Sequence, residues 1–366
     1  MRGNSGRHPG DGKPNAHHTV GDEARAPVNA HPSATIASRA QIRGFVVENV
    51  LVPQAKVTMM RDVTMSILIT GGTGLIGGHL CRALIERGDR LTVLTRRPDR
   101  ASVRWPQIRF TDTLETLDVN ERLNAVVNLA GESIATRPWT RRRRKKLRDS
   151  RIGTTERLMT LIERLDQKPE VLVSGSALGY YGQHPSRTFS EDSEPIPGSF
   201  SHALCKDWEA AAARAADLGV RVCTMRTALV LARDGGLLKQ MLLPFRLGLG
   251  ARIGNGDQWM SWIHIRDLTQ LLVQALDDER FAGPVNAAAP HAVTNREFTR
   301  TFGKVLHRPT PFVMPAFALK ALLGQMAEEL LIAGTRIAPE RATQLGVDFA
   351  FPRLEDALTD LLVNSP

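Results

Sequence analysis

A glycine-rich turn between a short apolar strand and an amphipathic helix constrains the fold more than any other stretch of the chain. The segment Ser66–Arg97 reads SILITGGTGLIGGHLCRALIERGDRLTVLTRR, with a β-branched run over residues 67–70 and helical apolar spacing from Leu75 onward. A second apolar run over residues 91–94 follows after Gly88. This order predicts a strand, a helix and a parallel strand, joined by a right-handed crossover.

The glycines of this turn predict a dinucleotide site, and an ordinary turn between a strand and a helix is the alternative. Gly71, Gly74 and Gly77 stand three residues apart, so the backbone can turn sharply, approach a pyrophosphate and pack the helix on the strand. The first N–H groups of the helix would face the anion. We expect the turn to contact the cofactor through Gly71, Thr73, Gly74, Leu75, Ile76 and Gly77.

The end of the second strand predicts which dinucleotide binds. NAD sites place an acidic residue about 20 residues beyond the glycines, where it accepts a hydrogen bond from the ribose 2′-hydroxyl. This chain has Thr95, Arg96 and Arg97 at that place. Guanidinium groups favour a 2′-phosphate by charge and by bidentate geometry, so NADP is the expected cofactor, with Thr95 and Arg96 beside it. A solvated loop that begins with the two arginines is the alternative.

Length, cysteine usage and charge argue against several other classes of function. The chain has 366 residues, 42% of them hydrophobic, and no apolar run approaches the roughly 18 residues of a membrane helix. Three widely spaced cysteines predict a reducing cytoplasm and no metal site. Much of the net charge of +10 lies in residues 141–146, RRRRKK. No aromatic residues are interleaved with that run and no known reading motif accompanies it, so we expect a solvated helix start rather than a nucleic-acid site.

Composition also divides the chain. Residues 1–58 are rich in Gly, Pro, His, Ala and Ser and have no apolar periodicity, so we expect a disordered extension. We expect an NADP-binding domain over residues 65–307, with substrate-cleft insertions from about residue 232. A small, α-rich C-terminal lobe is expected over residues 308–366.

Later segments are expected to complete the cofactor site. The buried strand AVVNLA, residues 125–130, should bring Leu129, Ala130 and Gly131 to the carboxyl edge of the sheet, where ligands bind. Arg151 lies where the following helix turns toward the core and is expected to point at the cofactor or a substrate anion. Leu231 ends a further strand and is expected to touch the nicotinamide.

The segment after residue 231 is expected to supply a lid. Its sequence ARDGGLLKQMLLPFRLGLG predicts a helix and a glycine-rich turn that close over a ligand. In the following IHIRDL, we expect Asp267 to cap the helix over residues 268–276 and His264 to be a structural residue.

Three polar residues are candidates for catalysis. Ser176 follows the strand VLVS, where a hydroxyl can bind a reacting oxygen, although a simple Ser/Gly-rich strand exit is the alternative. His202 and Lys206 occupy positions i and i+4 of a helix that begins near Ser201, so they share a face. The alternative is that the two side chains simply lie at the start of a helix and take no part in catalysis.

Together these segments resemble the extended short-chain dehydrogenase/reductase superfamily. The motifs are TGGTGLIG, NLAGE, SGSALGYYG and WIHIRDL. Further segments narrow the resemblance, over residues 65–363, to the atypical epimerase branch of the bacterial YfcH-like proteins with its characteristic C-terminal domain: PFRLGLG, GNGDQWMSWIHIRD, PVNAAAP and MPAFALKALLGQMAEELL. The resemblance implies an α/β Rossmann fold with a doubly wound parallel sheet, bound NADP, and epimerase/dehydratase-like chemistry on a small carbonyl compound or nucleotide sugar.

One departure from the superfamily concerns catalysis. Its catalytic tyrosine is followed four residues later by a lysine, which lowers the pKa of the phenol. Neither Tyr180 nor Tyr181 has a lysine at that distance. His202 and Lys206 stand where the pair should fall, and an imidazole can exchange a proton near neutral pH. Tyr181 is a second expected proton donor.

Two functional hypotheses remain open. The first is a cytoplasmic NADP-dependent oxidoreductase or nucleotide-sugar epimerase in which the dyad is altered to His202 and Lys206. The second is a catalytically weak or inactive NADP-binding regulatory protein that acts through a protein partner. The sequence predicts neither a membrane nor a nucleic-acid partner, and it leaves the substrate and a homodimer open.

Overall fold

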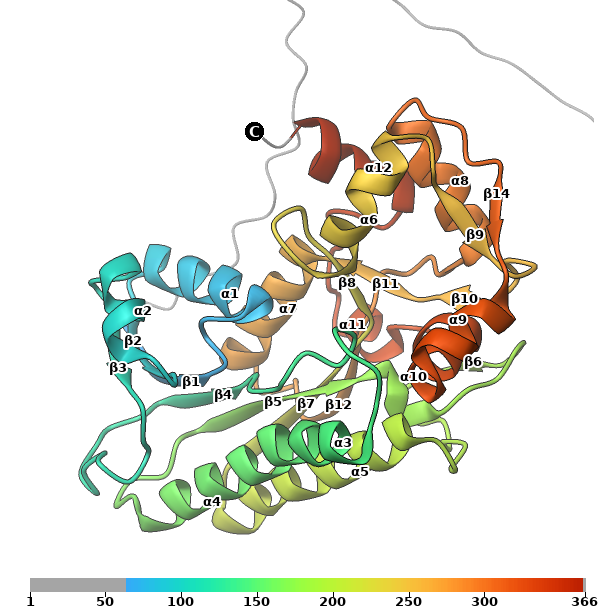
Figure 1. The fold of residues 1–366 in the computed structure, drawn as a ribbon. Coiled ribbons are helices and arrows are strands. Elements are labelled where there is room, and N and C mark those ends of the chain that lie inside the picture. The colour runs from blue at the N-terminus through green and yellow to red at the C-terminus, as the bar shows by residue number, and fades with distance from the viewer. Residues whose placement is uncertain (1–63, 365–366) are drawn as a thin grey trace, which may run out of the picture. The chain divides into compact units, whose positions relative to one another are not determined.

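Seven parallel strands form the central sheet of residues 64–364, the part of the chain that the computed structural model describes (Figure 1). Their spatial order is β12-β7-β5-β4-β1-β2-β3, so the chain winds outward in both directions from β1. The strands are β1 (Ser66–Thr70), β2 (Arg90–Leu94), β3 (Arg109–Thr111), β4 (Ala125–Asn128), β5 (Val171–Ala177), β7 (Arg221–Thr227) and β12 (Gly283–Ala287). The predicted doubly wound α/β fold is confirmed, whereas the predicted disorder of residues 1–58 lies outside the described residues.

The first strand-helix-strand unit follows the sequence pattern closely. Helix α1 (Leu75–Glu86) connects β1 to β2, and the two strands pair in parallel from Ser66 opposite Arg90 to Thr70 opposite Leu94. Gly88 follows the helix at φ +92°, a conformation that favours glycine.

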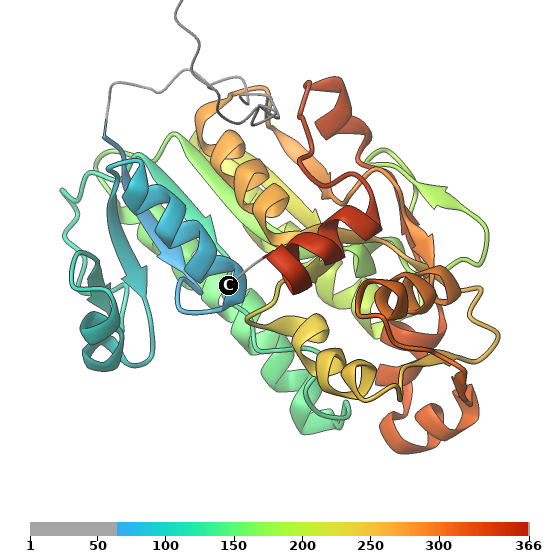
Figure 2. The ribbon, with the colours of Figure 1, turned by 90° about the horizontal axis from the view of Figure 1, so that it is seen from above.

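Helices cover both faces of the sheet (Figures 1 and 2). Helix α1 and α7 (Ile265–Asp277) pack side by side on one face, and α4 (Thr154–Arg164) and α5 (Phe200–Ala213) pack on the other. Because side chains alternate along a strand, Ile67 and Ile69 join the core under α1 and α7, while Leu68 joins the core under α4. Both cores hold the carboxyl edge of the sheet in place.

The basic run forms the start of a continuous helical stretch. Helix α3 (Arg141–Arg148) begins after Thr140, whose hydroxyl accepts a hydrogen bond from the Arg143 N–H at 3.1 Å. A π-helical turn, Asp149–Gly153, leads directly into α4. Acidic neighbours offset part of the charge, since Arg143 Nη1 lies 3.1 Å and Lys146 Nζ 3.5 Å from the carboxylate of Glu132.

The remaining elements complete the C-terminal part and the connections. The short strands form pairs: β6 (Thr188–Phe189) with β15 (Arg336–Ile337), β8 (Leu229–Leu231) with β11 (Trp262–His264), β9 (Ala251–Ile253) with β14 (Phe312–Met314), and β10 (Trp259–Met260) with β13 (Val293–Thr294). The other helices are α2 (Pro98–Arg104), α6 (Gly236–Arg246), α8 (Asn295–Val305), α9 (Ala316–Leu323), α10 (Gln325–Ala327), α11 (Glu340–Gln344) and α12 (Leu354–Thr359). Single helical turns cover Leu178–Tyr181, Arg214–Leu218, Glu328–Ile332 and Asp360–Asn364.

The C-terminal residues share cores with the rest of the chain. Leu354 and Leu358 of α12 pack with Leu231 and Trp262 in a third core, and Ala342 of α11 joins the core under α1 and α7. Among the helices of the described residues, none has the length and apolar character that a bilayer span requires.

The cap of α7 differs from the prediction. His264, not Asp267, caps the helix, because its Nδ1 accepts the Arg266 N–H at 3.1 Å. Asp267 lies inside the first turn and accepts the backbone N–H groups of Ala350 and Phe351 at 2.9 and 3.1 Å. The imidazole of His264 is fully buried and stacks on Phe351 at 3.9 Å, so its predicted structural role is supported.

This cap should make stability depend on pH. Burial, with a smaller effect from the charge of Arg266, lowers the pKa of His264 to about 3, and the Asp360 carboxylate, 3.3 Å from Nε2, opposes this shift. Protonation therefore favours the unfolded chain, and this contribution to stability, complete above about pH 6.5, is lost as the pH falls toward 3. In urea titrations, we expect about 2 kcal/mol of this contribution to disappear between about pH 7.5 and 5.0.

His264→Asn is the matched control, because the amide oxygen can replace Nδ1 as the acceptor of the cap but does not titrate. Its free energy of unfolding should fall less than that of the parent protein over the same pH range. Parallel pH profiles for the two proteins would contradict the assignment.

Candidate functional site

The glycine turn at the end of β1 has the geometry of a close backbone approach. Gly71 adopts φ +74°, and a Cβ there would lie 2.4 Å from the carbonyl oxygen of Leu129. A Cβ on Gly77 would lie 2.3 Å from the oxygen of Gly71. The Gly74 N–H closes the turn onto the Gly71 oxygen at 2.9 Å. Any larger residue at Gly71 or Gly77 would therefore displace the strand or the helix.

A pocket with a volume of about 890 Å³ opens directly beyond this turn. Five of the predicted cofactor residues line it: Thr73, Gly74, Leu75, Thr95 and Arg96. Gly71, Ile76 and Gly77 support the turn from behind and do not line the pocket. The sequence prediction missed several lining residues, namely Gly72, Gly78, His79, Arg82, Arg100, Ala101, Arg104, Trp105, Asp234 and Gly235.

Arginines dominate one wall of the pocket. Arg96 and Arg97 follow β2, and three more come from α1 and α2, namely Arg82, Arg100 and Arg104. The guanidinium carbons of Arg82 and Arg104 lie 5.8 and 5.7 Å from the ring of Trp105, within the range of a cation–π contact. Arg96 is 88% exposed, and its Nη1 is 3.9 Å from Glu132, a weak and screened contact. This wall is suited to a phosphate group.

Another part of the lining comes from the segment predicted to be a lid. Asp234 and Gly235 precede α6, and the Asp234 carboxylate lies 3.2 Å from Nε2 of His79 on α1. A Cβ on Gly235 would lie 2.7 Å from a methyl carbon of Leu75. The segment thus rests on the first two turns of α1 and adds Asp234 and Gly235 to the lining of the pocket.

The end of β4 lies beside the glycine turn, as predicted. The Ala130 N–H donates to the Thr70 hydroxyl at 3.1 Å, and Gly71 packs on the backbone of Leu129. Leu129 and Ala130 are half-buried, whereas Gly131 is exposed. These three residues are placed to border a ligand that extends from the pocket along the edge of the sheet.

Two predicted contacts, those of Arg151 and Leu231, stay predictions. Arg151 is half-buried, and its Nη1 donates to the backbone oxygens of Glu132 and Leu147 at 3.0 and 3.3 Å. Its guanidinium lies 5.3 Å from the ring of Trp208 and packs on Gly131, where a Cβ would meet the guanidinium carbon at 2.9 Å. Leu231 is fully buried in the third core, so it presents no surface to a nicotinamide. In both cases side-chain packing, which the local sequence does not reveal, decides the direction.

Ser176 belongs to a buried polar network. Its hydroxyl donates to Glu209 Oε1 at 2.6 Å, and Glu209 forms a two-pronged ion pair with Arg226, at 3.0 and 2.9 Å. The three residues come from β5, α5 and β7. Because the Ser176 hydroxyl donates its only proton to Glu209, it can accept a hydrogen bond from a ligand but cannot donate one.

Tyr181 is held in the same network. Its hydroxyl donates to Asn286 Oδ1 at 2.7 Å and accepts from Arg226 Nη1 at 2.9 Å. The side chain is fully buried, and burial raises the pKa of Tyr181 to about 12 although Arg226 opposes the rise. A phenol in this state is a poor partner for an incoming substrate, which disfavours its predicted role as proton donor.

His202 and Lys206 both lie on α5, but their surroundings differ. His202 is buried, and its Nδ1 lies 2.5 Å from the carbonyl oxygen of Tyr180, whereas Lys206 is exposed. No hydrogen bond or ion pair joins the two side chains within residues 64–364. Because a carbonyl only accepts, Nδ1 carries the proton and Nε2 keeps a lone pair. His202 is therefore equipped to act as a base without Lys206.

Tyr180 is the residue that the sequence reasoning overlooked. Its ring is half-buried and packs on the guanidinium of Arg226, with the guanidinium carbon 3.5 Å from the ring centroid. Its carbonyl is anchored by His202. Within the described residues, its hydroxyl has no hydrogen-bond partner, unlike that of Tyr181. The doubled tyrosine in GYYG was the available signal, since adjacent residues after a strand point in different directions.

The C-terminal segment fixes the start of α5. The carboxylate of Glu329 accepts the N–H groups of Phe200 and Ser201 at 3.0 and 2.8 Å, where the free N–H groups of a helix favour an anion. Ser199 caps the same helix by accepting the His202 N–H at 3.0 Å. The position of His202 therefore depends on a residue more than a hundred positions further along the chain.

Comparison with known proteins agrees with this geometry. The family model described as NAD dependent epimerase/dehydratase family matches residues 67–288, and a domain of unknown function, DUF1731, matches residues 314–361. An epimerase family protein of Mycobacterium leprae, ML0860, is 38% identical over 80% of this chain and 94% of its own length.

Two solved structures are also similar. The human epimerase family protein SDR39U1, crystallised with NADPH, is 35% identical over 82% of this chain and 100% of that chain, with a TM-score of 0.75. A nucleoside-diphosphate sugar epimerase from Corynebacterium glutamicum is 30% identical over 83% of this chain and 59% of that chain, with a TM-score of 0.66. The chain belongs to the NAD dependent epimerase/dehydratase family, within the extended short-chain dehydrogenase/reductase fold, and also matches DUF1731 over residues 314–361.

Proposed function

We propose that this protein binds NADP(H) and uses it to oxidise or reduce a small carbonyl compound or a nucleotide sugar. The observation that carries the proposal is the arginine-lined pocket directly beyond the glycine turn. The NADPH named with the human relative supports the cofactor, and the name of the Corynebacterium relative supports a nucleotide sugar as substrate.

The residues around the pocket fit this cofactor. The turn from Gly71 to Gly77 offers backbone N–H groups, and its four glycines carry no side chain to obstruct a pyrophosphate. Thr95, Arg96 and Arg97 would hold a 2′-phosphate, and the edge residues 129–131 would border the other half of the molecule. When bound, NADPH supplies a hydride.

A hydride transfer to a carbonyl also needs a proton at the carbonyl oxygen. Tyr180 and His202 meet at the start of α5, and Ser176 donates to Glu209 further along the same helix. Within the described residues, the hydroxyl of Tyr180 and Nε2 of His202 have no hydrogen-bond partner. We assign the proton exchange to one of these two groups. Ser176 would accept a hydrogen bond from a substrate hydroxyl, and Lys206 has no assigned part because it is exposed.

The alternative, a regulatory protein with weak or no catalysis, is favoured by a specific observation. Tyr181 and Ser176, two of the candidates for catalysis, both use their protons inside the buried network. Such a protein would change its interaction with a partner when NADP binds. The cytoplasm is the proposed compartment, supported by three buried thiols without disulfides, Cys81, Cys205 and Cys223.

Binding measurements test the cofactor assignment. The parent protein should bind NADPH more tightly than NADH, and Arg96→Ala should weaken NADPH about tenfold to a hundredfold, because it removes a charge-assisted contact with the 2′-phosphate. NADH affinity should change little. Fluorescence titration of both cofactors gives the two dissociation constants.

Arg300→Ala is the matched control, since Arg300 is an exposed arginine on α8 outside the pocket. It should leave both dissociation constants unchanged. Equal affinity of the parent protein for NADH and NADPH would contradict the assignment of Arg96.

A turnover assay separates the two functions. Protein with bound NADPH is incubated with a panel of carbonyl compounds and nucleotide sugars, and both the NADPH absorbance and epimerised products are followed. Oxidation of NADPH or an epimerised sugar supports the enzyme. Tight NADPH binding without either, across the panel, supports the regulatory protein.

A further inference from the structure

The start of α5 is held by its own cap and by a side chain from the C-terminal region. Ser199 accepts the His202 N–H at 3.0 Å, and the Glu329 carboxylate accepts the N–H groups of Phe200 and Ser201 at 3.0 and 2.8 Å. The Ser201 hydroxyl also donates to Glu329, at 2.6 Å. Two of the three N–H groups at this helix start therefore depend on the region that DUF1731 matches.

A helix start does not need a distant carboxylate to be capped. The caps of α3, α7 and α8 are the residues directly before each helix, Thr140, His264 and Thr294. Helix α5 has such a cap as well, in Ser199. The Glu329 contact is therefore an addition to a capped helix, and it fixes the position of α5 relative to the C-terminal region.

A second contact ties Glu329 to helix α3. Gln325 Nε2 donates to Glu329 Oε1 at 2.6 Å, and Arg144 Nη2 of α3 donates to Gln325 Oε1. The guanidinium carbon of Arg144 also lies 5.3 Å from the ring of Phe200. Helices α3, α5 and α10 share a core that contains Leu147, Leu204 and Met326. We call Gln325 and Glu329 the C-terminal clamp, because they join α3 to the start of α5.

Ser201, which Glu329 holds by two hydrogen bonds, also packs on the turn that carries Tyr180. Ser201 is 7% exposed, and a Cβ on Gly179 would lie 2.9 Å from the Ser201 Cβ. The hydrogen bond of His202 Nδ1 with the Tyr180 oxygen joins the same two segments. Because the segments are in close contact at Gly179, a shift of Ser201 would move His202 relative to the turn.

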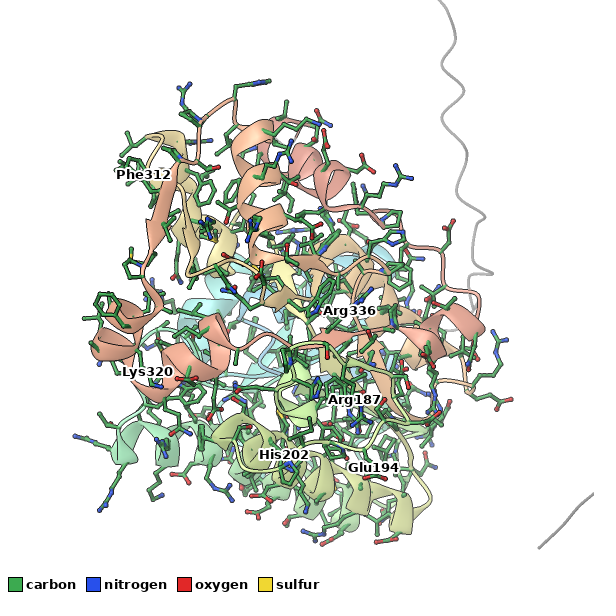
Figure 3. The ribbon with its side chains drawn as sticks, turned by 90° about the vertical axis from the view of Figure 1, so that its right-hand side faces the viewer. Arg187, Glu194, His202, Phe312, Lys320 and Arg336 are labelled. Carbon is green, nitrogen blue, oxygen red and sulfur yellow. The ribbon has the colours of Figure 1, made fainter. Side chains whose placement is uncertain are left out.

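We propose that Glu329 is a positioning residue for His202, and that the C-terminal clamp gives the region matched by DUF1731 a part in catalysis. This role rests on the proposed function, in which Nε2 of His202 exchanges the proton. Glu329 fixes Ser201, and the next residue of the helix then keeps Nδ1 on the Tyr180 oxygen, which orients the lone pair of Nε2. Figure 3 looks onto this side of the molecule, with His202 labelled on α5 and Lys320 on α9, the helix before α10.

Glu329→Gln in the full chain tests the clamp. The amide keeps the size of the carboxylate, but one of its two polar atoms donates, so two of the four hydrogen bonds that Glu329 accepts must be lost. Turnover of the identified substrate should fall about tenfold to a hundredfold, the effect of a small misplacement of a reacting group. The dissociation constant of NADPH should not change, because Glu329 does not line the pocket.

Glu355→Gln is the matched control, since it breaks an exposed ion pair of the same region, with Lys304 at 2.7 Å. It should keep the rate and the NADPH affinity of the parent protein.

A double-mutant cycle distinguishes the positioning of His202 from general support of the fold. Where His202→Asn has already removed the base, Glu329→Gln should have little further effect on the rate. The rate losses of the two single variants should therefore not multiply. A further tenfold loss in the His202→Asn background would mean that Glu329 acts on Tyr180 or on the whole fold, and it would overturn the assignment to His202.

A spectroscopic measurement tests the clamp without a substrate. In nitrogen NMR spectra of the imidazole groups, the His202 signals are identified by their loss in His202→Asn and should show the proton on Nδ1 in the parent protein. Glu329→Gln should move them toward the other tautomer, and Glu355→Gln should leave them in place. If the parent protein turns over no substrate, the enzymatic function fails while this measurement still decides the clamp. Unchanged His202 signals in Glu329→Gln would overturn it.

Gln325→Ala replaces Glu329→Gln if circular dichroism shows that the latter does not fold. Gln325 is exposed, and its removal cuts the tie to Arg144 while the bonds between Glu329 and α5 remain. Turnover should fall about twofold to thirtyfold, the usual range for residues that act through a neighbour. A rate and His202 signals equal to those of the parent protein would count against the clamp.

Discussion

Replacing Arg226 by methionine should lower the free energy of unfolding by about 3–5 kcal/mol, because the change leaves the Glu209 carboxylate without its partner in a largely buried place. Arg226 and Glu209 side chains are only 5% and 14% exposed, and two hydrogen bonds join them. Removal of Arg226 also leaves the hydroxyl of Tyr181 with one partner fewer. Urea denaturation of the parent and variant measures the loss.

Two further variants show whether the loss comes from the buried charge. In Arg226→Met/Glu209→Leu both charges are absent, and most of the stability should return, since apolar residues can replace a buried pair at little cost. Arg214→Met breaks the exposed pair with Glu163, at 3.3 Å, and should cost less than about 1 kcal/mol. The interpretation fails if Arg226→Met costs no more than Arg214→Met.

The sequence predicted those parts of the fold in which residues close together in the chain determine the secondary structure. The glycine turn, α1 and β2 are specified within 32 residues by strand and helix periodicity, and the structure follows them closely. The order of the sheet is not local, but parallel strands separated by helices permit few arrangements. The motif resemblance then selected the doubly wound one.

The candidate site was predicted only in part, because its walls come from segments far apart in the sequence. Arg96 and Arg97 were found through their distance from the glycines, whereas Arg82 on α1 joins the same pocket only when the helix is packed on the sheet. No periodicity distinguishes Arg82 from an ordinary exposed arginine of α1. The acidic partner of His79 is likewise 155 positions away.

Side-chain direction was the least predictable property. Arg151 was expected to point at a ligand, and the sequence did not reveal that two backbone oxygens, the Trp208 ring and Gly131 surround its guanidinium. His202 and Lys206 have the predicted spacing, yet one is buried and the other exposed. Spacing along a helix fixes which residues share a face, but the neighbouring elements decide what each side chain meets.

The other large effect should be on turnover, measured on whichever substrate the panel identifies. If Nε2 of His202 is the base, His202→Ala and His202→Asn should both lower the rate about 10²–10⁴-fold, the usual contribution of a positioned acid or base. NADPH affinity should stay the same, because His202 does not line the pocket. Single-turnover kinetics and cofactor titration give the two quantities.

The asparagine variant distinguishes this role from a supporting one. Its side-chain amide can still donate to the Tyr180 carbonyl, as Nδ1 does in the parent, but it offers no base in place of Nε2. If His202 serves only to hold Tyr180, then His202→Asn should keep most of the rate, and Tyr180→Phe should instead lose it, because that change removes the hydroxyl and keeps the ring on Arg226. Full activity in both His202→Asn and Tyr180→Phe would exclude both groups as the proton carrier, and the absence of any turnover in the parent would favour the regulatory protein.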